Sequence, residues 1–157
     1  MREILFKAKR IDNGKWVEGY YYKISETTYC FKEDYERKPV PEHHYILQER
    51  MTDWGLPNQM VQIEIDPKTL CQFTGMTDKN GVRIWKNDIV EAWSQGSRAI
   101  GTVKQRVDGL WIMSPAWQNH EFWELKPNSN GETTVEVLVN AFDNPELLQE
   151  VRQNEQS

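Results

Sequence analysis

The sequence has no long apolar segment. None of its runs approaches the roughly 20 apolar residues that a helix needs to cross a bilayer. The first residues, MREILFK, also lack the apolar stretch of a signal peptide. We therefore expect a soluble, cytoplasmic protein that does not contact a membrane.

Cysteine is scarce as well. The two cysteines, Cys30 and Cys71, do not form a CxxC pair, so their spacing does not indicate a zinc site. Each lies in a strand-like run of residues. This placement predicts two buried thiols in a reducing compartment rather than a disulfide.

Signatures of catalysis are missing. The sequence contains no nucleophile elbow with its serine. It also contains no Cys and His that the sequence alone would bring together in a catalytic pair. Gly75 and Gly81 do not form a phosphate-binding loop, because the helix with its Lys and Ser/Thr does not follow them. We therefore expect a non-enzymatic protein without a cofactor.

Candidate metal ligands have simpler explanations. His43 and His44 are adjacent, so on a strand their side chains point to opposite faces and cannot hold one ion together. Asp78, Asp88 and Glu91 could form an acidic cluster for metal-dependent phosphodiester chemistry. Both aspartates, however, stand at turns, where carboxylates accept backbone N–H groups. We expect no metal site, and a metal-dependent hydrolase or nuclease is the third alternative for function.

Positive charge is not in excess. The chain has 19 Lys and Arg against 24 Asp and Glu, which gives a net charge of −5. This balance argues against a general binder of nucleic acid or membrane surfaces. It leaves a local basic patch open, because net charge does not report where the charges lie.

Aromatic residues and alternating apolar runs are abundant. The chain has 7 Trp, 6 Tyr and 5 Phe, and its apolar residues recur with a period of two between turn residues. This pattern predicts a mainly β (α+β) fold of antiparallel strands. We expect the strands at residues 3–9, 15–23, 27–32, 43–48, 60–65, 70–73, 82–85, 88–93, 98–107, 110–113 and 133–141.

The connections follow from proline, glycine and charge. Residues 33–42 and 51–58 are expected as loops, and residues 121–125 fit either a strand or a helical turn. Asn144 and Pro145 are typical of a helix start, so a short C-terminal helix is expected to about Gln153. Gly19 could mark a β-bulge.

The chain is expected to form one domain, residues 1–157. Within it, residues 1–66 would form a β-rich N-terminal part and residues 67–153 a barrel-like C-terminal part. The order of strands and turns from Asp88 to Met113 resembles the first strands of a small SH3-like barrel. We therefore expect an SH3-like barrel element in the C-terminal half.

The stretch from Thr69 to Trp93 organises the chain. It contains two demanding turns between apolar runs, and such turns set the register of the strands they join. Glycine and asparagine there supply positive φ angles, and aspartate bonds to local backbone. The residues expected to act as structural turns are Gly75, Asp78, Asn80, Gly81 and Asp88.

Basic and aromatic residues interleave on several strands. On one face of a β-sheet this arrangement could stack single-stranded bases. The alternative is that the aromatics form the core and a subunit interface, where large aromatics are enriched. The candidate binding patch consists of Trp16, Tyr21, Lys23, Arg98, Lys104, Arg106 and Trp111.

The central stretch resembles the YopX family of phage and prophage proteins. The resemblance rests on TLCQFTGMTDKNG followed by DIV, with REILFKA and WVEG before them and VEVLVN and NPELL after them, in the same order along the chain. Asn87 and Val139 depart from the family pattern, which has Gly at both positions. Residues 94–131 match only loosely.

The resemblance implies an α+β or mainly β fold, a phage or prophage origin and homo-oligomeric assembly. It implies no enzymatic activity. We therefore expect a self-associating binding or interaction protein, with nucleic acid or a host or phage protein as a further partner. A nucleic-acid-binding accessory factor in phage replication or regulation is the alternative.

Overall fold

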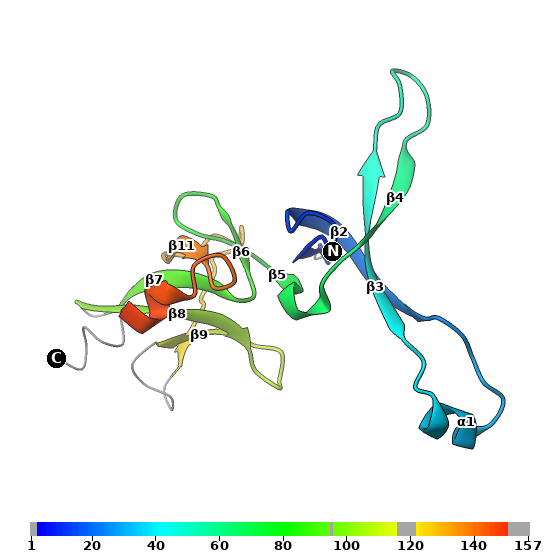
Figure 1. Cartoon of the computed structure of the whole chain (residues 1–157). Helices are drawn as coiled ribbons and strands as arrows, with labels where there is room; N and C mark the ends of the chain where they lie inside the picture. Colours follow the sequence, from blue (N-terminus) through cyan, green and yellow to red (C-terminus); the bar gives the residue numbers. More distant parts are fainter. Residues whose placement is uncertain (1–2, 95, 116–121, 151–157) are drawn as a thin grey trace. The chain divides into compact units, whose positions relative to one another are not determined.

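Antiparallel strands are the main secondary structure of the chain, as the alternating sequence predicted (Figure 1). The structure is a computed structural model that describes residues 3–94, 96–115 and 122–150. It divides into two compact units, one from Ile4 to Leu70 and one from Cys71 onward together with Glu3. Each unit has a hydrophobic core of its own.

The first unit is a meander of four strands: β1 (Phe6–Lys9), β2 (Trp16–Ser25), β3 (Glu42–Arg50) and β4 (Gln59–Glu64). Each strand pairs with the next along the chain. Residues two apart on these strands enter the core, which contains Ala8, Val17, Ile46, Ile63 and Ile65. The predicted alternation of residues 60–65 is confirmed, with Ile63 and Ile65 buried and Gln62 and Glu64 exposed.

Gly19 lies at the point where β2 stops pairing with β1 and begins to pair with β3. Residues up to Gly19 pair with β1, and residues from Tyr20 onward pair with β3. A Cβ atom on Gly19 would lie 2.1 Å from the carbonyl oxygen of Leu47. The glycine thus permits a close approach of the β3 backbone, and the pairing shows no register shift at this point.

The expected strand at residues 27–32 is wrong. This segment leads instead into the short helix α1 (Lys32–Arg37), and Cys30 is exposed rather than buried. The Tyr29 N–H donates to Tyr35 Oη at 2.9 Å, and the two rings pack edge to face. Acidic residues in the first turn of the helix complement its dipole. The loop expected at residues 33–42 therefore contains most of this helix.

The second unit combines a hairpin with a five-stranded sheet. The hairpin is β5 (Cys71–Thr77) and β6 (Arg83–Trp85), after the 3₁₀ turn η1 (Pro67–Thr69). The sheet has the order β10-β9-β8-β7-β11. Its strands are β7 (Asp88–Ser94), β8 (Ser97–Gln105), β9 (Trp111–Pro115), β10 (Trp123–Glu124) and β11 (Glu136–Asn140).

The core of the second unit lies between this sheet and the hairpin. Met76 and Ile84 of the hairpin pack with Val90, Val103 and Met113 of the sheet. The sheet itself is open, with β10 and β11 at its edges, so the expected closure into a small barrel is not found among the described residues. The SH3-like comparison therefore extends only to the order of strands and turns.

Helices are few. A short C-terminal helix follows Pro145 as expected and is seen at residues 146–150, while residues 151–153 lie outside the described part. Cys71 is buried, as predicted. Within the described residues, no helix has the length and apolar character required to cross a membrane.

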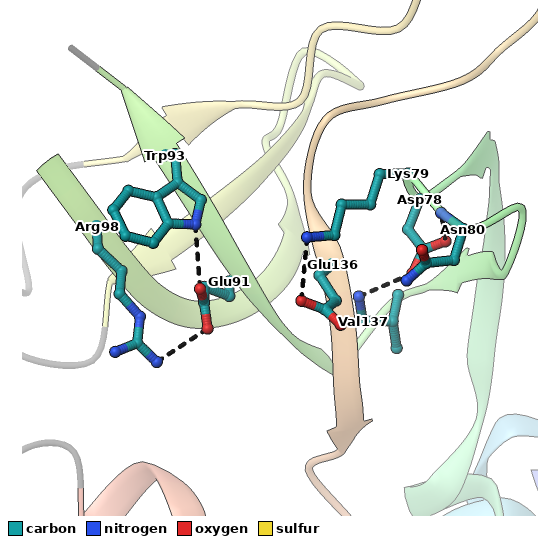
Figure 2. A network of polar contacts seen from close by, with 8 residues as sticks. All are labelled: Asp78, Lys79, Asn80, Glu91, Trp93, Arg98, Glu136 and Val137. Carbon is teal, nitrogen blue, oxygen red and sulfur yellow. Dashed lines mark hydrogen bonds and ion pairs between the residues drawn. The ribbon is translucent and has the colours of Figure 1, made fainter. Parts of the chain in front are cut away.

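The turn after β5 depends on the buried carboxylate of Asp78. Its Oδ1 accepts from the backbone N–H groups of Asn80 at 2.8 Å and Val82 at 2.9 Å. Its Oδ2 accepts from the N–H of Val137 on β11 at 3.0 Å, which Figure 2 also shows. One side chain thereby closes the turn and attaches it to the sheet.

The second turn, at Asn87, follows the same logic. Asn87 takes a φ of 71°, which asparagine tolerates better than most residues, so the turn survives without glycine. The buried Asp88 carboxylate accepts from the Trp85 N–H at 2.8 Å and from the Asn140 side-chain amide at 3.1 Å. Gly75 and Gly81 have φ values of 83° and 81°. The five turn residues thus act on the backbone.

We predict that Asp78→Ala lowers the free energy of unfolding by about 3 kcal/mol, because it leaves three N–H groups without their acceptor. Urea unfolding followed by tryptophan fluorescence measures this loss. The control is Asp108→Ala, which removes an exposed ion pair and one turn bond and should cost less than about 1 kcal/mol. Equal losses in the two variants would contradict the structural role of Asp78.

Candidate interaction surfaces

The acidic residues considered as metal ligands have other partners. Asp78 and Asp88 hold backbone turns, as described above, and Glu91 accepts from Trp93 and Arg98. Among the described residues, no group of three or more His, Cys, Asp or Glu side chains is arranged to hold a metal ion. His43 and His44 also separate, since His43 meets Glu64 while His44 meets Tyr21.

The first-unit half of the candidate patch is split between two faces of the sheet. Trp16 lies with the ammonium groups of Lys7 and Lys9, which are 4.9 and 5.3 Å from its ring centroid. Tyr21 belongs to the opposite face, where it packs against the core and its Oη lies 2.7 Å from His44 Nδ1. Lys23 is two residues from Tyr21 on β2, so its side chain points to the same face as that of Tyr21. Trp16 therefore does not share a surface with Tyr21 and Lys23.

Arg98 and Lys104 of the second unit lie on the same face of β8 but are far apart. Six residues separate them along the strand, which corresponds to about 20 Å. Arg98 forms an ion pair with Glu91 at 2.9 Å, and Lys104 is exposed. The two charges do not form one cluster.

The remaining two residues of the patch are also not available together. Arg106 pairs with Asp108 at 2.9 Å, and its guanidinium lies over the ring of Phe122 at 4.9 Å. Trp111 is only 4% exposed and belongs to the hydrophobic core of the second unit. A buried ring cannot stack on a ligand, so Trp111 was placed wrongly in a binding patch.

Sequence reasoning missed the most exposed of the large apolar side chains of the first unit, that of Trp54, and its exposed apolar neighbours in sequence. They lie on the hairpin formed by β3 and β4, and the connecting residues 51–58 form the irregular loop that was predicted. Trp54 is 92% exposed, and three other large apolar side chains are also exposed. We call residues 51–60 the hairpin tip; its exposed apolar residues are Met51, Trp54, Leu56 and Met60. The sequence did indicate this exposure, because the apolar residues of the tip recur with neither the period of a strand nor that of a helix.

Local hydrogen bonds order the hairpin tip. Asp53 accepts from the N–H of Trp54 at 2.7 Å through its side chain, and from the N–H of Leu56 at 3.1 Å through its carbonyl. Gly55 has a φ of 81°, the positive value that a type II turn requires at this position. Thr52 and Asn58 add bonds to Pro57 and Glu49. Trp54 is thus presented on a defined turn.

The base of the same hairpin carries an imidazole between two carboxylates. His43 Nδ1 lies 3.0 Å from Glu64 Oε1 on β4, and Nε2 lies 3.4 Å from Glu26 Oε2. The hydrogen bond with Glu64, and then that with Glu26, raises the pKa of the His43 imidazole above its usual range. When protonated, His43 joins β3 to β4 by charge as well as by backbone bonds.

The second unit contains a groove of about 470 Å³ with aromatic walls. Trp93 at the end of β7 is 58% exposed, and Phe122 is 45% exposed. We call this the aromatic groove; the lining residues that matter here are Trp93, Phe122, Trp123, Glu124, Lys126 and Thr134. A second groove of about 720 Å³ shares Lys126, Thr133 and Thr134 with it.

A polar network holds Trp93, one of the residues that line the aromatic groove (Figure 2). The indole N–H of Trp93 donates to Glu91 Oε1 at 3.1 Å, while Arg98 donates to Glu91 Oε2 at 2.9 Å. Glu136 lies opposite Glu91 on β11 and pairs with Lys79 at 3.3 Å. Two neighbouring carboxylates thus each have a cation, and the Trp93 ring is held in place.

The sequence and the structure of this chain were compared with those of known proteins and protein families. The family described as YopX protein matches residues 5–149. The chain belongs to the YopX family. The crystal structure of protein EF1440 from Enterococcus faecalis aligns over 94% of this YopX chain and 99% of its own, at 17% identity and a TM-score of 0.49. Among curated proteins, none matches the sequence.

We predict that Glu64→Gln lowers the pKa of His43 toward about 6.5, the value of a free imidazole. An NMR titration of the His43 ring protons measures this change, with Glu49→Gln as the control on the same hairpin. The raised folded-state pKa implies a stabilisation that is complete below about pH 6.5 and is lost as the pH rises through the folded value. An unchanged His43 pKa in Glu64→Gln would contradict the assigned contact.

Proposed function

We propose that this YopX protein is a non-enzymatic, self-associating interaction module of phage or prophage origin that acts in the host cytoplasm. The observation that carries the proposal is the hairpin tip, where four large apolar side chains are exposed on and beside an ordered turn. The four side chains lie within ten residues of one another, and large contiguous apolar patches are typical of sites that contact another protein.

The energetics favour a protein partner. Burying one large apolar side chain fully contributes about 1.5–3 kcal/mol, so the tip can offset much of the roughly 4–15 kcal/mol that association costs. Tryptophan is enriched among the few residues that dominate binding energy. Asp53 is the one charged residue of the tip, and Glu49 and Arg50 precede it on β3, so the tip has no excess of positive charge to attract phosphates.

The edge of the hairpin favours association with like chains. β4 is the last strand of the first unit's meander and pairs there only with β3. A strand edge that is not covered is a template for pairing with another chain. The hairpin tip and the uncovered edge of β4 belong to the same β3–β4 hairpin, which we call the arm. One partner would therefore bury both.

We predict that Trp54→Ser weakens self-association by about 30-fold or more, because an interface tryptophan contributes at least about 2 kcal/mol. Size-exclusion chromatography with light scattering over a micromolar concentration series measures the effect. Val107→Ser is the matched control, since Val107 is a fully exposed apolar residue at another hairpin turn. A wild-type protein that stays strictly monomeric would refute self-association.

Nucleic-acid binding is the second proposal, and a different surface supports it. Strand alternation and pairing place Tyr20, Tyr22 and Tyr45 on the same face of the first-unit sheet as Trp16. Lys7 and Lys9 lie against Trp16 on this face. Aromatic rings beside basic groups suit a single strand, whose bases stack while its phosphates pair with cations.

We predict that the double variant Lys7→Glu, Lys9→Glu lowers the affinity for a single-stranded oligonucleotide. The slope of log affinity against log salt should become shallower by about 1.4, since each phosphate contact contributes about 0.7. Fluorescence anisotropy measures both quantities, with Lys104→Glu as the control. Absence of salt-dependent binding by the wild type would end this proposal and leave self-association untouched.

A further inference from the structure

We infer that the second unit binds a compact, uncharged ligand whose carbonyl-type oxygen accepts the indole N–H of Trp111. The site is a pocket of about 340 Å³ beside the core of that unit, because Met76, Trp111 and Leu125 belong to both. We call it the indole pocket; its residues that matter here are Thr74, Met76, Leu110, Trp111, Leu125 and Pro127. None of them belongs to the hairpin tip, so the pocket and self-association are independent properties of the chain.

Trp111 supplies the donor. In the part of the chain that the structure describes, its Nε1 is the only buried side-chain nitrogen or oxygen without a hydrogen-bond partner. An indole N–H can only donate, and buried polar groups nearly always have a partner. In the interior an unpaired donor is costly, so an oxygen that reaches it is bound more strongly than at the surface. The ring is too buried to stack on a ligand, and its N–H alone makes the contact.

The indole is the part of Trp111 that faces the pocket. Gln105 of β8 flanks the backbone of Trp111 on one side, and on the other side its carbonyl accepts from the Leu125 N–H at 3.2 Å. The side chain lies on the core face of β9 with that of Met113, two residues further along the strand. Met76 lines the same pocket, and its unbranched side chain repacks readily, which gives an oxygen access to Nε1.

The lining favours an uncharged ligand. None of the described residues around the pocket carries a charge. The hydroxyl of Thr74 is already engaged, because it donates to the Ile84 carbonyl at 2.8 Å and accepts from the Met76 N–H at 3.1 Å. A charged group would lose its water here without gaining a counter-charge. An apolar body with one oxygen acceptor therefore fits the lining.

The size of the pocket limits the ligand further. Its volume stands at the lower end of the range of small-molecule sites, which is about 300–1,000 Å³. Gly75, Gly109 and Gly131 also line it, with φ values of 83°, 92° and 81°. These glycines serve the backbone, and as a consequence parts of the wall are bare backbone that a flat ring can approach. Size and chemistry together indicate a ketone or amide on a single ring.

The test uses three probes that share a phenyl ring: acetophenone, α-methylstyrene and benzoate. α-Methylstyrene has a methylene group in place of the ketone oxygen, and benzoate is charged. Proton–nitrogen NMR of the full-length chain follows the Trp111 indole signal, which is the one missing from Trp111→Phe. Acetophenone should move this signal downfield and bind about fivefold more tightly than α-methylstyrene, as one neutral hydrogen bond allows. Benzoate should not bind.

Three variants separate the donor from the pocket. Trp111→Phe keeps an aromatic ring and removes the donor, so it should bind acetophenone and α-methylstyrene equally. Trp93→Phe is the matched control, because it removes an indole N–H that already donates to Glu91, and the preference for acetophenone should remain. Leu110→Trp enlarges a lining side chain while the donor stays, so it should weaken the binding of both neutral probes. It replaces Trp111→Phe in the test if that variant does not fold.

The inferred site is refuted if millimolar acetophenone leaves the Trp111 signal unchanged. Equal affinity of the wild type for acetophenone and α-methylstyrene, or a preference that persists in Trp111→Phe, would show that the N–H does not hold the ligand. Binding of benzoate in place of acetophenone would overturn the uncharged class. None of these results bears on self-association, which the Trp54→Ser experiment tests separately.

Discussion

The buried carboxylate of Asp78 connects the parts of the second unit. It satisfies N–H groups within its own turn and one on β11, nearly 60 residues later in the chain. Backbone groups buried without partners are costly, so this single acceptor determines where β11 can dock. The position of β11 in turn sets Glu136 opposite Glu91, and Glu91 orients Trp93. The turn residue therefore also determines that Glu136 lies beside the contact between Glu91 and Trp93.

Local chemistry explains which features the sequence could predict. The turns at Asp78 and Asn87 were predictable because their hydrogen bonds and φ angles involve near neighbours. Helix α1 was not, because the aromatic residues Tyr29 and Phe31 favour a strand by propensity. In the structure Tyr29 instead packs against Tyr35 of the helix, a contact between residues six positions apart that a strand pattern does not predict. Barrel closure failed as a prediction because strand order alone does not determine whether sheet edges meet.

The candidate patch shows a different limit. Trp16 and Tyr21 are an odd number of residues apart on β2, so alternation alone would have separated them. The burial of Trp111 depends on which face of the sheet the β5–β6 hairpin covers, and a single strand does not reveal this. For the exposure of Trp54, the only indication in the sequence was that the apolar residues around it show no strand or helix periodicity. Aromatic content therefore indicated interaction surfaces but not their positions.

Because β2 changes its pairing partner at Gly19, the outer part of the β3–β4 hairpin, which is exposed for binding, is separate from the part that forms the core. Beyond Leu47, β3 pairs only with β4, so the outer arm contributes little to the core of the first unit. Insertions, deletions or substitutions between Gln48 and Val61 would change the reach and chemistry of the arm while the buried residues stay in register. Related chains could thus diverge in what they bind without having to evolve a new scaffold.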